Sequence, residues 1–182
     1  MIRIEDLALS ILTKTTVIPE FKSKDGDLNE FLMQEAKDYQ EQLLAVTYLL
    51  QNPKTSEVVA YFSLLNDTIK FEEDDKKTRN RINRKIPYVK QRNHYPAVKI
   101  GRLATNKSAR GLGVGSMMLN TIIESYRGDN KAGCRFITVD AYTDAIPFYL
   151  KQGFVPLSKT DEGADTRLLY FDLESVKDTK TE

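Results

Sequence analysis

The sequence predicts an α/β fold in which helices cover both faces of a sheet. The first observation is the order of its segments, which reads strand, helix, three strands, helix, strand, helix, two strands. The second is a glycine-rich loop between an apolar run and an amphipathic helix in the middle of the chain. The third is composition, because 41% hydrophobic residues in a chain of 182 are enough for a real core.

The N-terminal part predicts one strand, one helix and a pair of strands. Residues 1–17 alternate weakly between polar and apolar and predict the first strand. Asp27 and Glu30 have the spacing of a capping box, and the apolar stripe that follows predicts a helix to about residue 41. Residues 43–50 and 58–65 predict two strands of an antiparallel hairpin, because turn-forming residues separate them.

The C-terminal part begins with a predicted strand over residues 97–104. Loop residues follow at 106–115, and apolar residues at helical spacing then predict a helix that ends at Gly128. The remaining predicted elements are a strand at 134–141, a short helix at 144–152, and strands at 154–157 and 167–173. Gly153 ends the short helix, and Pro147 fits it only in the first turn.

Length and composition predict one domain over residues 1–174, followed by a polar tail at 175–182. Cys134 is the only cysteine, so the chain forms no internal disulfide, which fits a reducing compartment. The sequence shows neither a signal peptide nor an apolar stretch of membrane-spanning length. We therefore expect a cytoplasmic protein without a membrane partner.

Charge is distributed unevenly along the chain. Ten basic residues and no acidic one lie between Lys76 and Arg102, in a charged excursion at about residues 72–95 and the strand after it. Since the net charge is +1, the rest of the chain carries −9. The basic segment is either a solvated surface beside the acidic run at 72–75 or a surface that binds the phosphates of nucleic acid. Phosphates of a cofactor are a further use of the same charge.

Gly111, Gly113 and Gly115 predict an anion cradle, with a plain tight turn as the alternative. Glycine lets the chain turn tightly and lets a ligand approach the backbone closely. The amides of residues 112–116 would point out of the open end of the following helix, which carries partial positive charge. The Walker and dinucleotide patterns do not fit, because Ser116 and the residue after it differ from what each requires.

Two motifs carry a resemblance to a known family. The run Arg110-Gly111-Leu112-Gly113-Val114-Gly115 resembles the pyrophosphate loop Arg/Gln-x-x-Gly-x-Gly/Ala of the GNAT acetyltransferases. The segment from Ala145 to Phe154 resembles the signature Ala-x-x-Phe-Tyr-x-x-x-Gly-Phe of the same family. The resemblance implies a mixed, mostly antiparallel sheet of six to seven strands, with acetyl-CoA bound in a V-shaped split between the fourth and fifth strands. It implies that acetyl-CoA contacts Leu103, Ala104, Thr105, Arg110, Gly111, Leu112, Gly113, Val114, Gly115 and Ser116.

The same resemblance assigns the acid chemistry to Tyr149. An amine attacks the thioester carbonyl, and the departing CoA thiolate takes a proton that a phenol can supply. Packing in the core is the alternative role for Tyr149. Asp140 and Glu124 are the candidates for a general base, with a structural role as the alternative for both. An α-amine, with a pKa near ~8, would need little help from a base. No metal site is predicted.

A narrower resemblance concerns the substrate and the partners. Residues 21–32, Ala36 and the run from Ile100 to Ala104 look like segments of the GNAT toxins of bacterial toxin–antitoxin pairs. This resemblance implies acetylation of the α-amine of aminoacyl-tRNA, which blocks translation, and inhibition by a small ribbon-helix-helix antitoxin. The candidate substrate contacts are Arg79, Arg84, Arg92, Arg102 and Asp140.

Two other functions stay open at this point. One is a stand-alone acetyltransferase for a small-molecule or protein amine. The other is a CoA-binding module without turnover, against which the intact Tyr149 argues. GNAT proteins often dimerise, so a homodimer is a further expectation.

Overall fold

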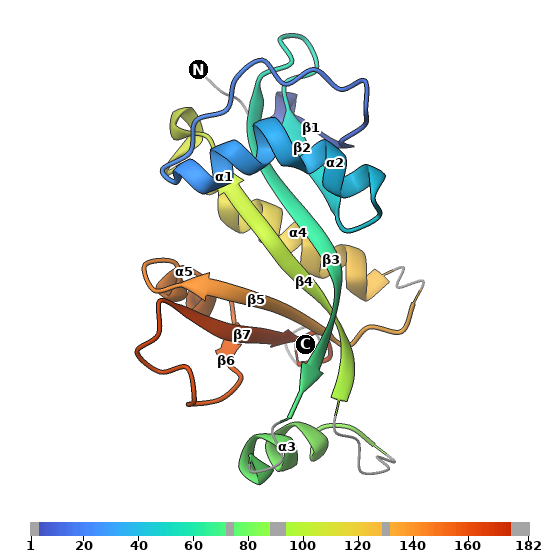
Figure 1. The fold of residues 1–182 in the computed structure, drawn as a ribbon, viewed down its shortest axis with the longest axis vertical. Helices are drawn as coiled ribbons and strands as arrows, with labels where there is room; N and C mark the ends of the chain where they lie inside the picture. Colours follow the sequence, from blue (N-terminus) through green and yellow to red (C-terminus); the bar gives the residue numbers. More distant parts are fainter. Residues whose placement is uncertain (1–3, 72–74, 88–93, 129–131, 176–182) are drawn as a thin grey trace, which may run out of the picture. The chain divides into compact units, whose positions relative to one another are not determined.

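The computed structural model describes residues 4–71, 75–87, 94–128 and 132–175 (Figure 1). Its elements are, in chain order, η1 (Ile4–Asp6), β1 (Ala8–Ile11), α1 (Gly26–Glu30), η2 (Phe31–Glu35), α2 (Ala36–Glu41), β2 (Val46–Gln51), β3 (Val58–Lys70), α3 (Lys76–Asn83), β4 (His94–Thr105), η3 (Lys107–Ala109), α4 (Val114–Gly128), β5 (Phe136–Tyr142), α5 (Ile146–Lys151), β6 (Val155–Pro156) and β7 (Thr166–Asp172).

The seven described strands form one hydrogen-bonded sheet in the order β1-β2-β3-β4-β5-β7-β6. The pair β4–β5 is parallel, and the pairs β1–β2, β2–β3, β5–β7 and β6–β7 are antiparallel. The predicted mixed, mostly antiparallel sheet of six to seven strands is therefore confirmed. The chain divides into two compact units, one made of residues up to Leu65 with Ile100–Glu124 and one of Asn66–Lys99 with residues from Ser125 onward.

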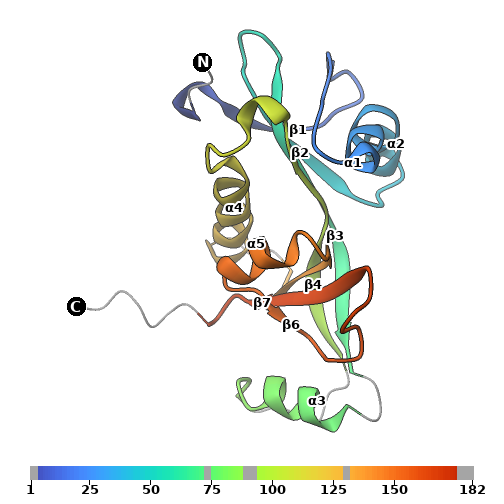
Figure 2. The ribbon, with the colours of Figure 1, turned by 90° about the vertical axis from the view of Figure 1, so that its left-hand side faces the viewer.

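In the first unit, the helical segment from α1 to α2 lies on one side of the strands and α4 lies on the other (Figure 2). The cap differs from the prediction, because the side chain of Asp25 accepts a hydrogen bond from Asp27 N at 2.9 Å. Asp25 has extended backbone and precedes the first helical residue, so it, and not Asp27, is the N-cap. The helix ends at Glu41, as predicted.

One turn of this helical segment, η2, is a π-helix. The wider turn fits a core in which Phe31, Leu32 and Ala36 are all buried. The core of the first unit consists of Leu12, Phe21, Phe31, Leu32, Ala36, Leu49, Val58, Tyr61 and Ala104. This core holds the end of β4 against the helical segment.

The predicted hairpin of β2 and β3 is present, with Val46 opposite Leu64. The first strand of the hairpin begins at Val46 instead of residue 43, because Leu43 adopts a positive φ of 58° that a strand does not allow. The second strand continues to Lys70, five residues beyond the prediction. Its last residues, from Asn66, belong to the second unit.

In the second unit, β5 pairs with β7 along its whole length and with β4 only briefly. The parallel ladder runs from Ala97 opposite Phe136 to Lys99 opposite Thr138. In the described part of the chain this ladder has no further rungs, although both strands continue. A ladder that ends early is what the predicted split between the fourth and fifth strands requires.

The charged excursion contains a packed helix, α3. Asp75 caps it by accepting a hydrogen bond from Thr78 N at 2.9 Å. Ile82 is 1% exposed and joins the core of the second unit, together with Tyr95 and Phe136. Residues 72–74 and 88–93 of the excursion lie outside the described part. The helix is thus built onto the core of its unit.

Candidate active site

The glycine loop follows directly after β4 and is fixed by hydrogen bonds at its start. Asn106 donates from its backbone N to Val59 O at 2.8 Å and from Nδ2 to Val58 O at 3.2 Å. Its Oδ1 accepts from Ser108 N at 3.2 Å, which begins the short helix η3. Ala109 and Val114, on either side of the loop, are each 1% exposed. The loop is therefore anchored at both ends within the first unit.

The loop itself has the geometry of an anion cradle. Gly111 and Gly113 adopt positive φ angles of 80° and 75°, which strain any other residue type. A Cβ atom at either position would meet no atom within 4 Å, so the space beside the backbone is open to a ligand. The first helical hydrogen bond of α4 joins Met117 N to Gly113 O at 3.0 Å. The amides of Val114 and Gly115 have no acceptor among the described residues and lie at the positive end of the helix.

These observations fit the binding of a pyrophosphate-containing cofactor. Every residue predicted to contact acetyl-CoA lies in the first unit, along the end of β4 or around the glycine loop. Leu103 and Thr105 are half-buried in the stretch of β4 that has no described rung with β5. Backbone groups in that stretch are available to a ligand. Arg110, at the start of the loop, is exposed.

Tyr149 lies on α5, in the second unit. Its side chain is 6% exposed and packs edge-on against Phe148 and Phe154, with ring centroids 5.1 and 5.4 Å away. Burial raises the pKa of Tyr149 well above its usual value, so the phenol stays protonated at neutral pH. Within the described residues, its hydroxyl forms no hydrogen bond. The environment thus provides a neutral phenol whose proton is not committed to another protein group.

The helix around Tyr149 agrees with the sequence pattern. It runs from Ile146 to Lys151, with Pro147 in its first turn. Gly153 follows with a φ of 88°, and a Cβ atom there would lie 3.2 Å from the ring of Phe171. Glycine is required at this position for both its backbone angle and its closeness to the ring.

The five predicted substrate residues have different environments. Arg79 is half-buried in α3, and Arg84 is exposed at the C-terminal end of that helix. Arg102 lies on β4 in the first unit, where its guanidinium stacks on the ring of Phe31. Arg92 lies outside the described residues.

Asp140 forms an ion pair with Lys99, which the sequence did not indicate. The side chains of Lys99 and Asp140 are 26% and 48% exposed, so the pair is open to solvent. It joins β4 to β5 next to the end of their ladder. Beneath it, buried Thr138 donates to Asp67 Oδ2 at 2.5 Å. Glu124, the second candidate base, is exposed on α4.

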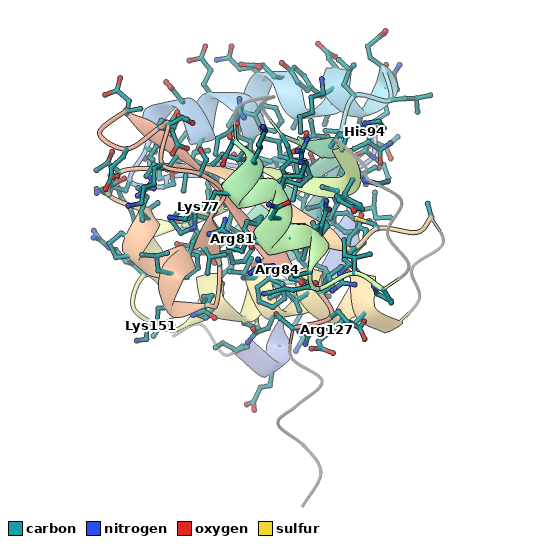
Figure 3. The ribbon with its side chains drawn as sticks, turned by 90° about the horizontal axis from the view of Figure 1, so that it is seen from below. Lys77, Arg81, Arg84, His94, Arg127 and Lys151 are labelled. Atoms are coloured by element: carbon teal, nitrogen blue, oxygen red, sulfur yellow. The ribbon has the colours of Figure 1, made fainter. Side chains whose placement is uncertain are left out.

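Five basic residues in the described part of the excursion are exposed, and one of them, Arg81, is hydrogen-bonded to other elements. The other four form what we term the α3 basic surface. It consists of Lys76, Lys77, Arg84 and Lys85. In the part of the chain that the structure describes, none of the four forms an ion pair. Figure 3 shows the helix from below, with Lys77 and Arg84 labelled on it.

Other basic residues hold α3 in place. Arg81 donates to Pro156 O at 3.2 Å and Leu157 O at 2.6 Å, and its guanidinium lies over the ring of Tyr170. Arg135 donates to Lys85 O at 3.1 Å while it pairs with Asp172. The basic segment therefore contains residues that hold α3 in place and exposed cations without a described partner. The sequence alone does not distinguish the two groups.

Within the described residues, no group of three or more His, Cys, Asp or Glu residues is arranged to hold a metal ion. None of the described helices combines the length and the apolar character needed to cross a membrane.

Part of the chain matches a known family model. Residues 73–156 match the sequence model of the acetyltransferase (GNAT) domain. That region includes α3, β4, the glycine loop, α4, β5 and α5. Both sequence motifs lie within it.

Solved structures with the same fold cover nearly the whole chain. A tyrosine-to-phenylalanine mutant of KacT is 26% identical, with a TM-score of 0.75, over 93% of this chain and 96% of its own. AtaT complexed with acetyl-methionyl-tRNA is 25% identical, with a TM-score of 0.74, over 94% and 97%. A mutant AtaT toxin bound to acetyl-CoA and the C-terminus of the antitoxin AtaR has a TM-score of 0.72 over 93% and 95%; at 23% identity this likeness shows the fold.

Proposed function

We propose that this chain is a GNAT acetyltransferase and that it moves an acetyl group from acetyl-CoA to the α-amine of aminoacyl-tRNA. The observation that carries the first half of the proposal is the cradle formed by Gly111 and Gly113 at the start of α4. Open amides and open space beside the backbone suit the pyrophosphate of acetyl-CoA. The end of β4, at Leu103 and Thr105, offers backbone partners for the pantetheine arm.

The chemical step is direct transfer without a covalent enzyme intermediate. The amine nitrogen attacks the thioester carbonyl, an N–C bond forms, and the C–S bond then breaks to release CoA thiolate. Tyr149 donates its phenolic proton to that thiolate, and the proton released by the amine restores the phenol by way of solvent. The buried, protonated state of Tyr149 supports this role.

An α-amine suits the groups that the structure offers. Its pKa near ~8 leaves part of it neutral and nucleophilic at pH 7, whereas a lysine amine near ~10.4 needs a stronger base. Asp140, the more central candidate base, is already paired with Lys99. An acceptor that needs little help from a base is therefore the better match.

The relatives support the same acceptor. AtaT, 25% identical to this chain, has been solved with acetyl-methionyl-tRNA, the molecule that acetyl transfer to the α-amine of methionyl-tRNA would yield. The α3 basic surface supports an RNA acceptor independently, because exposed lysines and arginines without protein partners bind phosphates and release counterions. We assign this surface to the phosphate backbone of tRNA.

The salt dependence of tRNA binding tests this assignment. Each phosphate contact that is lost lowers the slope of log K against log salt by about one. Lys77→Gln combined with Lys85→Gln should therefore reduce the slope by about two and leave acetyl-CoA binding unchanged. Lys54→Gln, which changes an exposed lysine in the turn of the β2–β3 hairpin, is the matched control. An unchanged slope in the double variant would remove α3 from the tRNA interface.

The proposal extends to partner and location. A toxin that acetylates aminoacyl-tRNA needs an inhibitor in the cell that makes it, and we propose a ribbon-helix-helix antitoxin for this role. The substrate places the protein in a bacterial cytoplasm. Co-expression with the protein encoded next to it tests the partner, because growth arrest by this chain should then be relieved.

A further inference from the structure

We propose that Arg102 binds the phosphate of the 3′-terminal nucleotide of the acceptor tRNA and so positions the aminoacyl group at the end of β4. This inference rests on the proposed function, which identifies the acceptor as aminoacyl-tRNA. It assigns a positioning role to one side chain in the first unit. Its evidence comes from the contacts of that side chain, which differ from those of the arginines that anchor α3.

The position of Arg102 is fixed by the core. The carbon at the centre of its guanidinium lies 4.9 Å from the ring centroid of Phe31, which is itself 3% exposed. Nη1 donates to Gly101 O at 2.8 Å. One face and one edge of the guanidinium are thus held by the protein, and the side chain is half-buried. A group fixed in this way loses little conformational freedom when it binds a ligand.

The remaining donors of Arg102 are available. Within the described residues, Nε and Nη2 form neither a hydrogen bond nor an ion pair. Asp25 and Glu35 influence the same neighbourhood, since they and Arg102 act on the pKa of Tyr61, yet Arg102 pairs with neither. By contrast, Arg81 and Arg135 donate hydrogen bonds to backbone carbonyls, and Arg135 also pairs with Asp172.

The chemistry of these donors favours a phosphate. A guanidinium binds an oxyanion through two parallel N–H groups, and such charge-assisted bonds are roughly twice as strong as neutral ones. A polyamine or a lysine side chain offers no such anion beside its reacting nitrogen. An aminoacyl ester at the end of a tRNA has a phosphate one nucleoside away from the amine. Arg102 is therefore suited to the nucleotide part of the acceptor.

Arg102 lies next to the stretch of β4 that is proposed to hold acetyl-CoA. It lies beyond Lys99, where the described ladder with β5 ends, and directly precedes Leu103. Leu103 and Thr105 are the residues whose backbone is proposed to hold the acetyl-CoA arm. Since alternate residues of a strand point to opposite faces, the Arg102 side chain faces the helical segment that contains Phe31. A nucleotide held there would lie beside the proposed thioester position on β4.

A cycle of two deletions tests the contact. The assay measures inhibition of acetyl transfer by uncharged tRNA with its 3′-terminal nucleotide and by the same tRNA without that nucleotide. The wild-type protein should bind the full tRNA about 10- to 100-fold more tightly, as expected for hydrogen bonds between charged groups. In Arg102→Met the two tRNAs should bind equally, because the phosphate has lost its partner. Arg102→Lys should retain part of the preference.

Controls separate this role from a structural one. Acetyl-CoA affinity and thermal stability should stay at wild-type values in Arg102→Lys, while KM for charged tRNA rises. Lys54→Gln should keep the full preference. Two results would overturn this inference and leave the proposed function standing. One is an undiminished preference of Arg102→Met for the tRNA with its 3′-terminal nucleotide. The other is an equal loss of acetyl-CoA binding and tRNA binding in Arg102→Lys. A wild-type protein that acetylates no charged tRNA would overturn the proposed function and this inference with it.

Discussion

Tyr149 illustrates how the surroundings of one residue determine its chemistry. An exposed phenol has a pKa near ~10, but the rings of Phe148 and Phe154 bury this one and raise its pKa. The phenol is therefore a weaker acid in the free protein and stays protonated throughout the pH range of an assay. In the proposed mechanism, its proton is transferred to the thiolate as that charge develops, so the hydroxyl would act in the transition state.

Replacing Tyr149 by phenylalanine removes the hydroxyl and retains the packing of the ring. We expect turnover to fall by about 10²- to 10⁴-fold, the usual contribution of a general acid, while acetyl-CoA affinity stays nearly unchanged. Steady-state kinetics and calorimetry check the two parts. Tyr170→Phe is a matched control, because Tyr170 is also buried in the second unit and has no proposed catalytic role. Full activity in Tyr149→Phe would return Tyr149 to the core.

The pH profile tests the same residue without a substitution. A group whose pKa is raised loses its proton only above that raised value, so the acid form of Tyr149 persists as the pH increases. From pH 7 to about 10, the usual pKa of tyrosine, the activity of the wild-type protein should not decrease through loss of the Tyr149 proton. Any decrease in that range should therefore also be present in Tyr149→Phe. A descending limb near pH 8 that vanishes in the variant would contradict the burial argument.

Gly113 offers a test in which backbone strain is separated from ligand binding. Its φ of 75° makes alanine unfavourable by roughly 1–2 kcal/mol. Gly163→Ala imposes the same strain, at a φ of 89° with no atom within 4 Å of the added Cβ, in a loop without a proposed ligand. Both variants should lose similar stability on chemical denaturation. Only Gly113→Ala should weaken acetyl-CoA binding, and Gly113→Glu should abolish it. Unchanged acetyl-CoA affinity in both Gly113 variants would remove the cradle.

At the scale of elements, α3 shows how a polar sequence becomes part of a folded unit. Ile82 is the one buried hydrophobic side chain of the helix as described. Two arginines add hydrogen bonds over long sequence distances: Arg81 donates to Leu157 O, and Arg135 donates to Lys85 O just after the helix. These contacts present the α3 basic surface on a fixed support. They also distinguish residues that determine stability from residues that determine binding.

Two variants of α3 should therefore behave oppositely. Ile82→Ala should destabilise the protein by about 2–5 kcal/mol, the range for truncating a buried isoleucine, and impair all activities through loss of folded protein. Lys77→Gln should leave the free energy of unfolding within about 0.5 kcal/mol of wild type, as surface substitutions do, and weaken only tRNA binding. Denaturation and tRNA titration at one salt concentration check both. Comparable destabilisation by Lys77→Gln would mean that the surface serves folding.

Elements with a strong local signal were predictable from the sequence. The glycine loop, the apolar stripe of α4 and the short helix between Pro147 and Gly153 all agree with the prediction, because their signals lie within a few neighbouring residues. The cap at Asp25 and the wide turn of η2 were not predictable, since each depends on how the helical segment fits the core.

Contacts between distant residues explain the rest of what the sequence concealed. Arg81 reaches the carbonyl of Leu157, and Lys99 pairs with Asp140 across two strands. The sequence grouped both cations with the basic run, because a charge run does not reveal which members have partners. Arg102 was selected as a substrate residue, but its support by Phe31 became visible only in the structure.

At the scale of the whole molecule, the proposed site residues are divided between the two units. The cofactor residues and Arg102 belong to the unit with Ile100–Glu124, whereas Tyr149, Asp140 and α3 belong to the other. The net charge of +1 leaves the protein almost neutral as a whole, so the proposed attraction to RNA would depend on the local basic segment.

The most direct test of the central claim is acetyl transfer from labelled acetyl-CoA to three acceptor pools. The pools are charged tRNA, polyamines with aminoglycosides, and lysine-containing peptides, each assayed with the wild-type protein and with Tyr149→Phe. We predict that label enters the charged tRNA, is released with the amino acid when the ester bond is hydrolysed, and is lost in the variant. Label that enters only small amines or peptides would contradict the claim and identify a stand-alone acetyltransferase.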